Sequence, residues 1–166
     1  MITSDNLFPA SLLTTGFVRN RIMLTIRREQ FAVFKPIAEE VFITSVVDYI
    51  RNEHGVRTIE LPDGAITIDA IADASLRTMV KGGIEQARRY DLTSKSAITS
   101  YVVLMFLTAP NFDHHPLIQH TLLDEGLDPN LRLDELWQRT VDQNWVAVRQ
   151  SYDPSEWQLK TEEAGT

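Results

Sequence analysis

The sequence predicts a mainly α-helical fold, a single-domain bundle of about five helices with a small β-hairpin or extended insert near residues 56–68. Three observations predict this fold class. Apolar residues recur three and four positions apart over several long segments, which is the period of an amphipathic helix. One short segment instead alternates on both sides of a Pro-Asp-Gly turn. With 166 residues, of which 43% are hydrophobic, the chain is long enough to bury one core.

The pattern divides the chain into three parts. Residues 1–24 show no clear period and are expected to form a loosely ordered leader, in which Met23 offers an alternative start. Residues 25–152 form the predicted helical domain. Residues 153–166 are expected to be an acidic, mobile tail, in which Trp157 is the one residue able to anchor it.

Residues 27–53 have the period of a first helix. Pro36 lies inside this segment, so either the helix kinks there or a short first helix ends at Phe34 and Pro36 opens the next one. Gly55 is a natural stop after His54. One apolar face is predicted, formed by Phe34, Ile37, Val41, Ser45 and Ile50 and widened by Phe31, Phe42, Val46 and Tyr49.

Residues 56–68 change period. Residues 58–61 and 65–68 alternate, and the turn Pro62-Asp63-Gly64 separates them. A small β-hairpin is the best interpretation. Because a lone hairpin is marginal in water, it must lean on the helices or be only an extended loop.

A second helix is predicted from Asp69 or Asp73 to Tyr90. Two glycines, Gly82 and Gly83, lie inside it, although each costs a helix about 1 kcal/mol relative to alanine. Gly83 lies at the centre of the apolar stripe with Ala87 one turn later, so the two form a notch where another helix can approach closely. Gly82 lies off the stripe and has no comparable explanation. The stripe comprises Leu76, Val80, Gly83, Ala87 and Tyr90.

The next helix is the predicted partner for that notch. Thr93 or Ser94 supplies its N-cap and Pro110 ends it. Residues 101–107 are continuously apolar, so this helix is expected to be buried on most sides. After the loop 111–116, Asp113 is expected to cap a short helix that Pro116 opens and Gly126 closes.

The last helix is predicted to begin at Asp128-Pro129. It carries a wide apolar face, and the two tryptophans on that face, Trp137 and Trp145, are eight residues apart. Such a pair either packs in the core or lines a groove for a partner helix. The face comprises Leu133, Leu136, Trp137, Val141, Trp145 and Val148.

The sequence contains no recognisable catalytic or cofactor-binding motif. There is no cysteine, which removes disulfides, thiolate catalysis and the usual zinc-finger ligands and fits a reducing compartment. No P-loop, dinucleotide fingerprint or G-x-S-x-G motif occurs. The paired acids Glu39-Glu40 and Asp134-Glu135 are neighbours that face different directions on a helix. We therefore expect no catalytic residue and no cofactor.

Three histidines near Asp113 invite a metal interpretation. His114 and His115 are adjacent, and His115 and His120 are five residues apart, which is off the i, i+4 spacing of two ligands on one helix face. A polar loop before a short helix is the preferred interpretation, and no metal site is predicted. Turnover that is lost on mutating these histidines would instead favour an enzyme.

Charge and hydropathy restrict the partners. The net charge of −7 argues against nucleic acid and anionic membranes. No apolar run approaches the ~20 residues that span a bilayer, and no secretion signal is convincing, so a cytoplasmic location is expected. Residues 113–135 hold six acids against Arg132 alone, which is either a solvated face or a surface that steers a protein partner.

Four stretches together resemble a group of small helical proteins that are encoded beside spike and effector genes in bacterial type VI secretion clusters. The stretches are "LTIRREQF", "MVKGGIEQARRYDLTSKSAITSYVVLMFL", "NFDHHPLIQHTLLD" and "LDELWQRTV", within residues 24–141. Asp91 stands where a glycine is common in those proteins, and the leader and hairpin-like insert are extra. The matching residues are Ile26, Arg27, Glu29, Gln30, Gly83, Ile84, Ala87, Tyr90, Tyr101, Leu104, Met105 and Phe106.

The resemblance implies a non-enzymatic accessory protein, an adaptor or chaperone for a type VI secretion effector. An immunity protein that neutralises a cognate toxin is the alternative, and the acidic region would suit it if the toxin is basic. In either case the partner is a protein, a secreted effector, a spike component or a toxin domain. The residues proposed to bind it are Arg27, Glu29, Trp137, Asp134 and Glu135.

Overall fold

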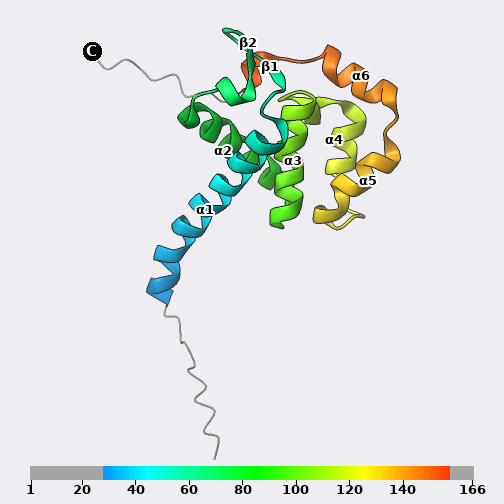
Figure 1. Cartoon of the computed structure of the whole chain (residues 1–166). Helices are drawn as coiled ribbons and strands as arrows, with labels where there is room; N and C mark the ends of the chain where they lie inside the picture. Colours follow the sequence, from blue (N-terminus) through cyan, green and yellow to red (C-terminus); the bar gives the residue numbers. More distant parts are fainter. Residues whose placement is uncertain (1–27, 158–166) are drawn as a thin grey trace, which may run out of the picture.

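A computed structural model describes residues 28–157, with side chains from residue 35 onwards. The prediction of a mainly α-helical fold with a small β-hairpin is confirmed (Figure 1). The predicted leader and residues 158–166 lie outside the described residues. The helices and strands are α1 (Arg28–His54), β1 (Thr58–Leu61), β2 (Gly64–Thr67), α2 (Asp73–Arg89), α3 (Lys95–Leu107), α4 (Pro116–Leu122), α5 (Arg132–Arg139) and α6 (Asp142–Gln150).

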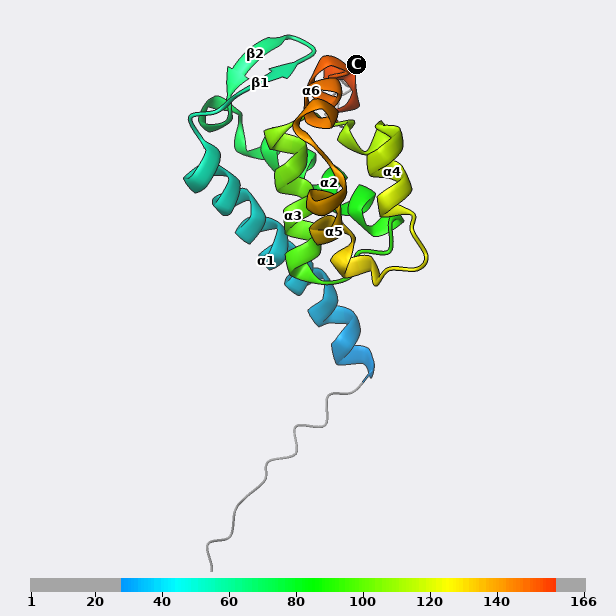
Figure 2. The same ribbon diagram turned by 90° about the vertical axis from the view of Figure 1, so that its right-hand side faces the viewer.

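Helix α1 runs without a break through Pro36, so the alternative with two helices is wrong. A proline costs a helix one backbone hydrogen bond, and α1 continues on both sides of it. The helix ends at His54, as Gly55 predicts. In both views the N-terminal end of α1 projects beyond the other helices (Figures 1 and 2).

The apolar face predicted for α1 is only partly the buried one. Ile50 is buried as expected, but Ile37, Val41 and Ser45 are exposed. The helix turns a different set toward the core, which comprises Phe42, Ile43, Val46, Val47 and Ile50. The sequence pattern merged two faces because α1 carries apolar residues on both sides.

Helices α2 and α3 form the centre of the bundle, and Gly83 is where they meet. The whole predicted stripe of α2 is buried. A Cβ atom added to Gly83 would lie 2.9 Å from Met105 Sδ and 3.2 Å from Val102 Cγ2 on α3. The notch therefore admits the side chains of α3, and burial of that apolar contact offsets the glycine penalty.

A Gly83→Leu substitution is expected to destabilise the fold by about 1–3 kcal/mol, because the added branched chain overfills the notch. Urea denaturation followed by circular dichroism measures it. Gly83→Ala is the control. It gains about 1 kcal/mol of helix propensity and requires a shift of the flexible Met105 thioether and a smaller one of Val102 Cγ2, so its net effect should be small. A Leu variant as stable as the parent would contradict this packing.

Helix α2 ends in a Schellman motif centred on Asp91. The amide of Asp91 donates to the Arg88 carbonyl (3.0 Å) and the amide of Leu92 donates to the Ala87 carbonyl (3.3 Å). Asp91 has φ of 60°, in the left-handed region that favours glycine. Glycine would adopt this conformation without the steric cost of a Cβ atom.

An Asp91→Gly variant is therefore expected to gain about 0.5–1 kcal/mol of stability, because glycine adopts a positive φ without steric cost. Thermal unfolding measures the gain. Asp91→Ala removes the same carboxylate but keeps a Cβ, so it should not be stabilised. Equal melting temperatures for the Gly and Ala variants would show that backbone strain at residue 91 is negligible.

The hairpin is held to the bundle by the C-terminal segment. Strands β1 and β2 pair antiparallel with Thr58 opposite Thr67 and Leu61 opposite Gly64. Trp157 is buried against Phe106 of α3, with ring centroids 4.8 Å apart. Its Nε1 donates to the Glu60 carbonyl of β1 (3.1 Å), and Tyr152 OH donates to the same carbonyl (2.8 Å). Residues 152–157 thus dock beside the hairpin, which is the support that an isolated hairpin needs.

Two predicted caps have different outcomes. Ser94 caps α3 as expected, because its Oγ accepts from the Ala97 amide (3.1 Å). Asp113 does not cap α4. Helix α4 begins at Pro116 with His115 at the N-cap, and it ends at Leu122, before Gly126. The Asp113 side chain is instead buried and bonded to α2.

The single last helix that the sequence predicts is two helices, α5 and α6, preceded by a 3-10 turn at Pro129–Leu131. Thr140 and Val141 both adopt extended backbone between them. The Asn144 side chain accepts from the Val141 amide (2.9 Å) and so caps α6. The chain turns at these two β-branched residues, which favour extended backbone over helix. The described part of the chain therefore contains six α-helices.

Candidate functional site

Large exposed apolar side chains fall mainly in two regions of the described residues. One is α1, and the other is the segment from α4 to α6. Figure 1 places the projecting end of α1 and the α5–α6 pair on opposite sides of the molecule. Contiguous exposed apolar surface is typical of protein interaction sites. The side chains are Ile37, Val41 and Tyr49 on α1, Val56 before β1, and Leu123, Leu131, Trp137, Val141 and Val146 in the second region.

The tryptophan surface, which we define as Trp137, Trp145, Val141 and Asp134, lies at the break between α5 and α6. The Trp137 side chain is 59% exposed, whereas Trp145 is only 9% exposed and belongs to the core. The two rings stack with centroids 5.2 Å apart. The Trp145 Nε1 donates to Thr140 Oγ1 (3.1 Å), and this hydrogen bond holds the buried Trp145 ring in place. Trp137 therefore lies on a rigid aromatic platform.

Trp137 and Val141 do not share the burial of the apolar face that the sequence assigns to them. On one continuous helix Trp137 and Val141 would share the face of Leu133 and Leu136, as the sequence predicts. Leu133, Leu136, Trp145 and Val148 are indeed buried, but Trp137, near the end of α5, and Val141, between α5 and α6, are exposed. The sequence left open whether the tryptophan pair packs in the core or lines a groove for a partner. In the structure, Trp145 lies in the core and Trp137 lies at the surface.

The predicted acidic partners of Trp137 differ in their surroundings. Asp134 is exposed and lies three residues before Trp137 on α5, hence on the same side of the helix. The Glu135 carboxylate is half-buried and accepts from Arg139 Nε (3.0 Å). Arg139 also pairs with Asp124 (2.9 Å). Only Asp134 of these acids presents an uncompensated charge beside Trp137 among the described residues.

The other two predicted partner-binding residues cannot be placed. Arg27 lies outside the described residues, and Glu29 lies in α1 at a position whose side chain is not described. The structure therefore brings together Trp137 and Asp134 of the five residues that the sequence singled out. Val141 joins them as an exposed neighbour that sequence periodicity assigned to the apolar face.

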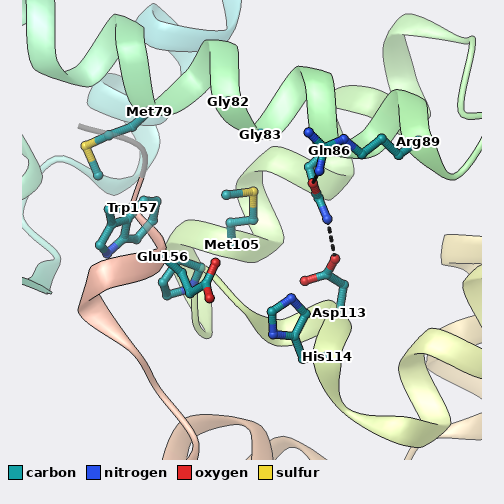
Figure 3. Close-up of a pocket in the computed structure, with 11 residues that line it drawn as sticks. Met79, Gly82, Gly83, Gln86, Arg89, Met105, Asp113, His114, Glu156 and Trp157 are labelled. Atoms are coloured by element: carbon teal, nitrogen blue, oxygen red, sulfur yellow. Dashed lines mark hydrogen bonds between the residues drawn. The ribbon is translucent and has the colours of Figure 1, made fainter. Parts of the chain in front are cut away.

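A small polar cavity of about 150 Å³ lies between α2, the loop after α3 and the C-terminal segment (Figure 3). Gly82 and Gly83 form part of its wall, which gives Gly82 a place that its sequence position did not explain. Asp113, only 1% exposed, is the central group. Its Oδ2 accepts from Gln86 Nε2 (3.0 Å) and from Tyr90 OH (2.9 Å).

The Tyr90 hydroxyl that bonds to Asp113 is not poised for acid–base chemistry. Burial raises the pKa of Tyr90, and the neighbouring Asp113 carboxylate raises it further. The phenol therefore keeps its proton at neutral pH and donates to Asp113 instead of accepting from a substrate. Both donors of the cluster, Tyr90 and Gln86, point at the same carboxylate oxygen. We interpret the group as a structural link between α2 and the segment that follows α3.

This interpretation predicts a stability effect at Asp113. Asp113→Ala leaves the buried Tyr90 hydroxyl and the Gln86 amide without their acceptor, and is expected to cost about 1–3 kcal/mol of unfolding free energy. Tyr90→Phe should cost less unfolding free energy in the Asp113→Ala variant than in the parent chain, because the hydrogen bond between Tyr90 and Asp113 is already lost there. Denaturant titrations of the four chains measure both quantities. Strictly additive losses would show that the two groups are not coupled.

The other titratable groups tested on the sequence do not converge on one site. Glu39 forms a two-bond ion pair with Arg88 (2.8 and 2.9 Å), whereas Glu40 pairs with Lys81 and Arg77. Hydrogen bonds from Lys81 and Arg77 lower the pKa of Glu40. Among the side chains of residues 35–157, no three of His, Asp or Glu form a group that could hold a metal ion. Of the helices in residues 28–157, none combines the length and apolar content needed to cross a bilayer.

Comparison with known proteins gives no family. No family model matches this chain, and no curated protein or solved structure matches it either. Function is therefore inferred from the geometry of its side chains and from the sequence stretches described above.

Proposed function

We propose that this chain is a non-enzymatic accessory protein that binds another protein, acting as an adaptor or chaperone for a secreted effector. The observation that carries the proposal is the exposure of Trp137 on the rigid Trp145 platform. Tryptophan is the residue type most enriched at binding hot spots. A ring that is already held in place loses little conformational entropy when a partner covers it.

The chemistry of the tryptophan surface defines the kind of partner. An indole ring flanked by Val141 fits an apolar pocket or groove, and Asp134 beside it favours a lysine or arginine at the rim. The resemblance to proteins encoded in type VI secretion clusters supports an effector or spike component as the client. The absence of cysteine fits binding in the cytoplasm, before secretion. The net charge of −7 argues against nucleic acid as the partner.

Co-purification tests the proposal. The full chain is expressed with an effector encoded beside it, in three forms: the full effector, the effector without its toxin domain, and the toxin domain alone. An adaptor or chaperone is expected to bind the first two forms and to leave the toxin activity intact. Binding restricted to the toxin domain, with loss of its activity, would contradict the proposal.

That second outcome would identify an immunity protein, the alternative function. One observation favours it: Glu125, Asp128 and Asp134 are all exposed, within ten positions of one another. An acidic surface of this kind suits a basic toxin site. The acidic region is smaller than the sequence predicts, because Asp113 is buried and Asp124 pairs with Arg139.

A further inference from the structure

Helix α1 carries exposed apolar residues on the side away from the core, next to a position that Arg77 of α2 reaches. Its inner face packs on the core through Phe42, Val46 and Ile50. On the opposite side, Ile37 is 55% exposed and Val41 is 62% exposed. A surface helix normally turns polar residues to the solvent on that side. Apolar residues on both sides of a helix indicate that it packs between two partners.

The exposed residues form an ordered stripe. Ile37, Val41, Thr44 and Asp48 follow one another at intervals of four, three and four residues, which is the spacing of a helix–helix seam. Together with Pro36, Glu40 and Ser45 they line one shallow, wide-open groove whose described lining residues all belong to α1. From residue 37 to residue 48 the groove runs about 17 Å, or three helical turns. We call these four positions the α1 stripe.

The polar groups in the groove are already satisfied, with one exception. Thr44 Oγ1 donates to the Glu40 carbonyl (2.8 Å) and accepts from Arg77 Nη1 of α2 (3.1 Å), and Ser45 Oγ donates to the Phe42 carbonyl (2.7 Å). Glu40 pairs with Lys81 (2.9 Å) on α2. Asp48 has no hydrogen bond or ion pair to any described residue and carries a free negative charge at the end of the stripe. An apolar helix can therefore cover the groove at little cost, except at Asp48.

The charge of Asp48 also indicates whether the α1 stripe binds a second copy of the chain or a different protein. In a parallel pair of stripes Asp48 meets Asp48, and in an antiparallel pair it meets Ile37. Both arrangements bury an unpaired carboxylate, which is costly. Each copy also brings a net charge of −7. A helix of another protein avoids these costs if it places a lysine or arginine opposite Asp48.

We propose that the α1 stripe binds an amphipathic helix of a partner protein, with apolar residues at three- and four-residue spacing and a lysine or arginine opposite Asp48. Figure 1 shows α1, which carries the stripe, and the α5–α6 pair, which carries the tryptophan surface, on opposite sides of the bundle. The proposal goes beyond the proposed function and is independent of it. If both hold, the protein can bring two partners together, which is what an adaptor does.

The test uses two synthetic helical peptides and the purified full chain. The peptides carry leucines at three- and four-residue spacing and differ only at one end of that stripe, where one has lysine and the other glutamate. Fluorescence anisotropy measures their dissociation constants. The lysine peptide is expected to bind at least about tenfold more tightly than the glutamate peptide. The Asp48→Lys variant is expected to reverse that order.

Two variants test whether the peptides bind at the α1 stripe, and light scattering tests whether a second copy of the chain occupies it. Val41→Asp should abolish binding of both peptides, whereas Val146→Asp, at an exposed position on α6, should leave it unchanged. Because Val41 is exposed, Val41→Asp should leave the melting temperature within about 2 °C of the parent. Light scattering of the parent chain is expected to give a monomer mass.

Four results would overturn the proposal. They are failure of both peptides to bind, equal affinity for the two peptides, a dimer that Val41→Asp dissociates, and a large loss of melting temperature in Val41→Asp. The third would identify a second copy as the occupant. The fourth would mean that the chain itself covers the stripe. None of the four affects the co-purification with an effector, so failure here is distinguishable from failure of the proposed function.

Discussion

Arg132→Met is expected to lose about 3–5 kcal/mol of unfolding free energy, the largest loss we predict for a single substitution in this chain. Arg132 is a charged residue that is only 6% exposed. Its Nη1 donates to the carbonyls of Tyr90 (3.0 Å) and Leu122 (2.8 Å). Its Nε donates to the carbonyl of Asp124 (3.1 Å).

The physical reason is that Arg132 satisfies the ends of two other helices. Tyr90 and Leu122 lie at the C-terminal ends of α2 and α4, where backbone carbonyls lack helical partners and carry partial negative charge. One guanidinium on α5 thus joins three segments. Methionine has similar bulk but no donor, so these buried carbonyls would be left unpaired.

Urea denaturation followed by far-ultraviolet circular dichroism measures the loss. Arg149→Met, the same substitution at an exposed position of α6, is the matched control and should change stability by less than about 0.5 kcal/mol. Arg132→Lys should recover part of the loss, because an ammonium reaches fewer carbonyls than a guanidinium. Equal midpoints for the two methionine variants would refute the role of Arg132.

The second large effect concerns binding. Trp137→Ala is expected to weaken binding of the partner protein by at least about 30-fold, the effect of losing one hot-spot residue. Folding should be unaffected, because Trp137 is largely exposed whereas Trp145 beneath it is buried. Val56→Ala, at the exposed residue before β1, is the control and should bind like the parent. Isothermal titration calorimetry with the co-purified partner measures the dissociation constants.

Asp134→Lys refines the same prediction. It reverses the charge beside Trp137 without touching the apolar contact, so it should slow association and change the salt dependence of binding. If Trp137→Ala binds as tightly as the parent, the partner uses another surface, and the α1 stripe is then the next region to test.

Local signals predicted most of the fold. Ser94 before α3, Gly55 after α1 and Pro116 at the start of α4 mark helix ends that the structure confirms. The Gly83 notch also followed from spacing alone, because a glycine in a buried stripe is informative only where a second helix comes close. Each of these signals lies within a few residues of the feature it predicts.

Features that depend on distant residues were missed. Arg132 looked like the single base of an acidic region, and Asp113 looked like a helix cap. Asp113 bonds to groups 23 and 27 positions away, and Arg132 joins a carbonyl 42 positions away to two that are 8 and 10 positions away. No pattern within one segment can reveal such a pairing, since burial of a charge depends on which groups meet it in space.

The helix break at Thr140–Val141 was missed for a different reason. The apolar period continues through the break, so a single long helix fits the pattern. The signal that was present is local: two β-branched residues, followed by Asn144 three positions later, whose side chain caps α6. This break places Trp137 and Trp145 on two different helices, so the candidate site includes a part of the fold that periodicity alone could not predict.

Fluorine NMR of the chain labelled with 5-fluorotryptophan tests the central claim most directly. The chain has three tryptophans, all in the described residues, and only Trp137 is exposed. Its signal, assigned with Trp137→Phe, should be the only one that shifts strongly between H₂O and D₂O. On addition of the unlabelled partner, the account predicts that this solvent shift disappears while the other two signals stay in place. A partner that binds and leaves the Trp137 solvent shift intact would contradict it.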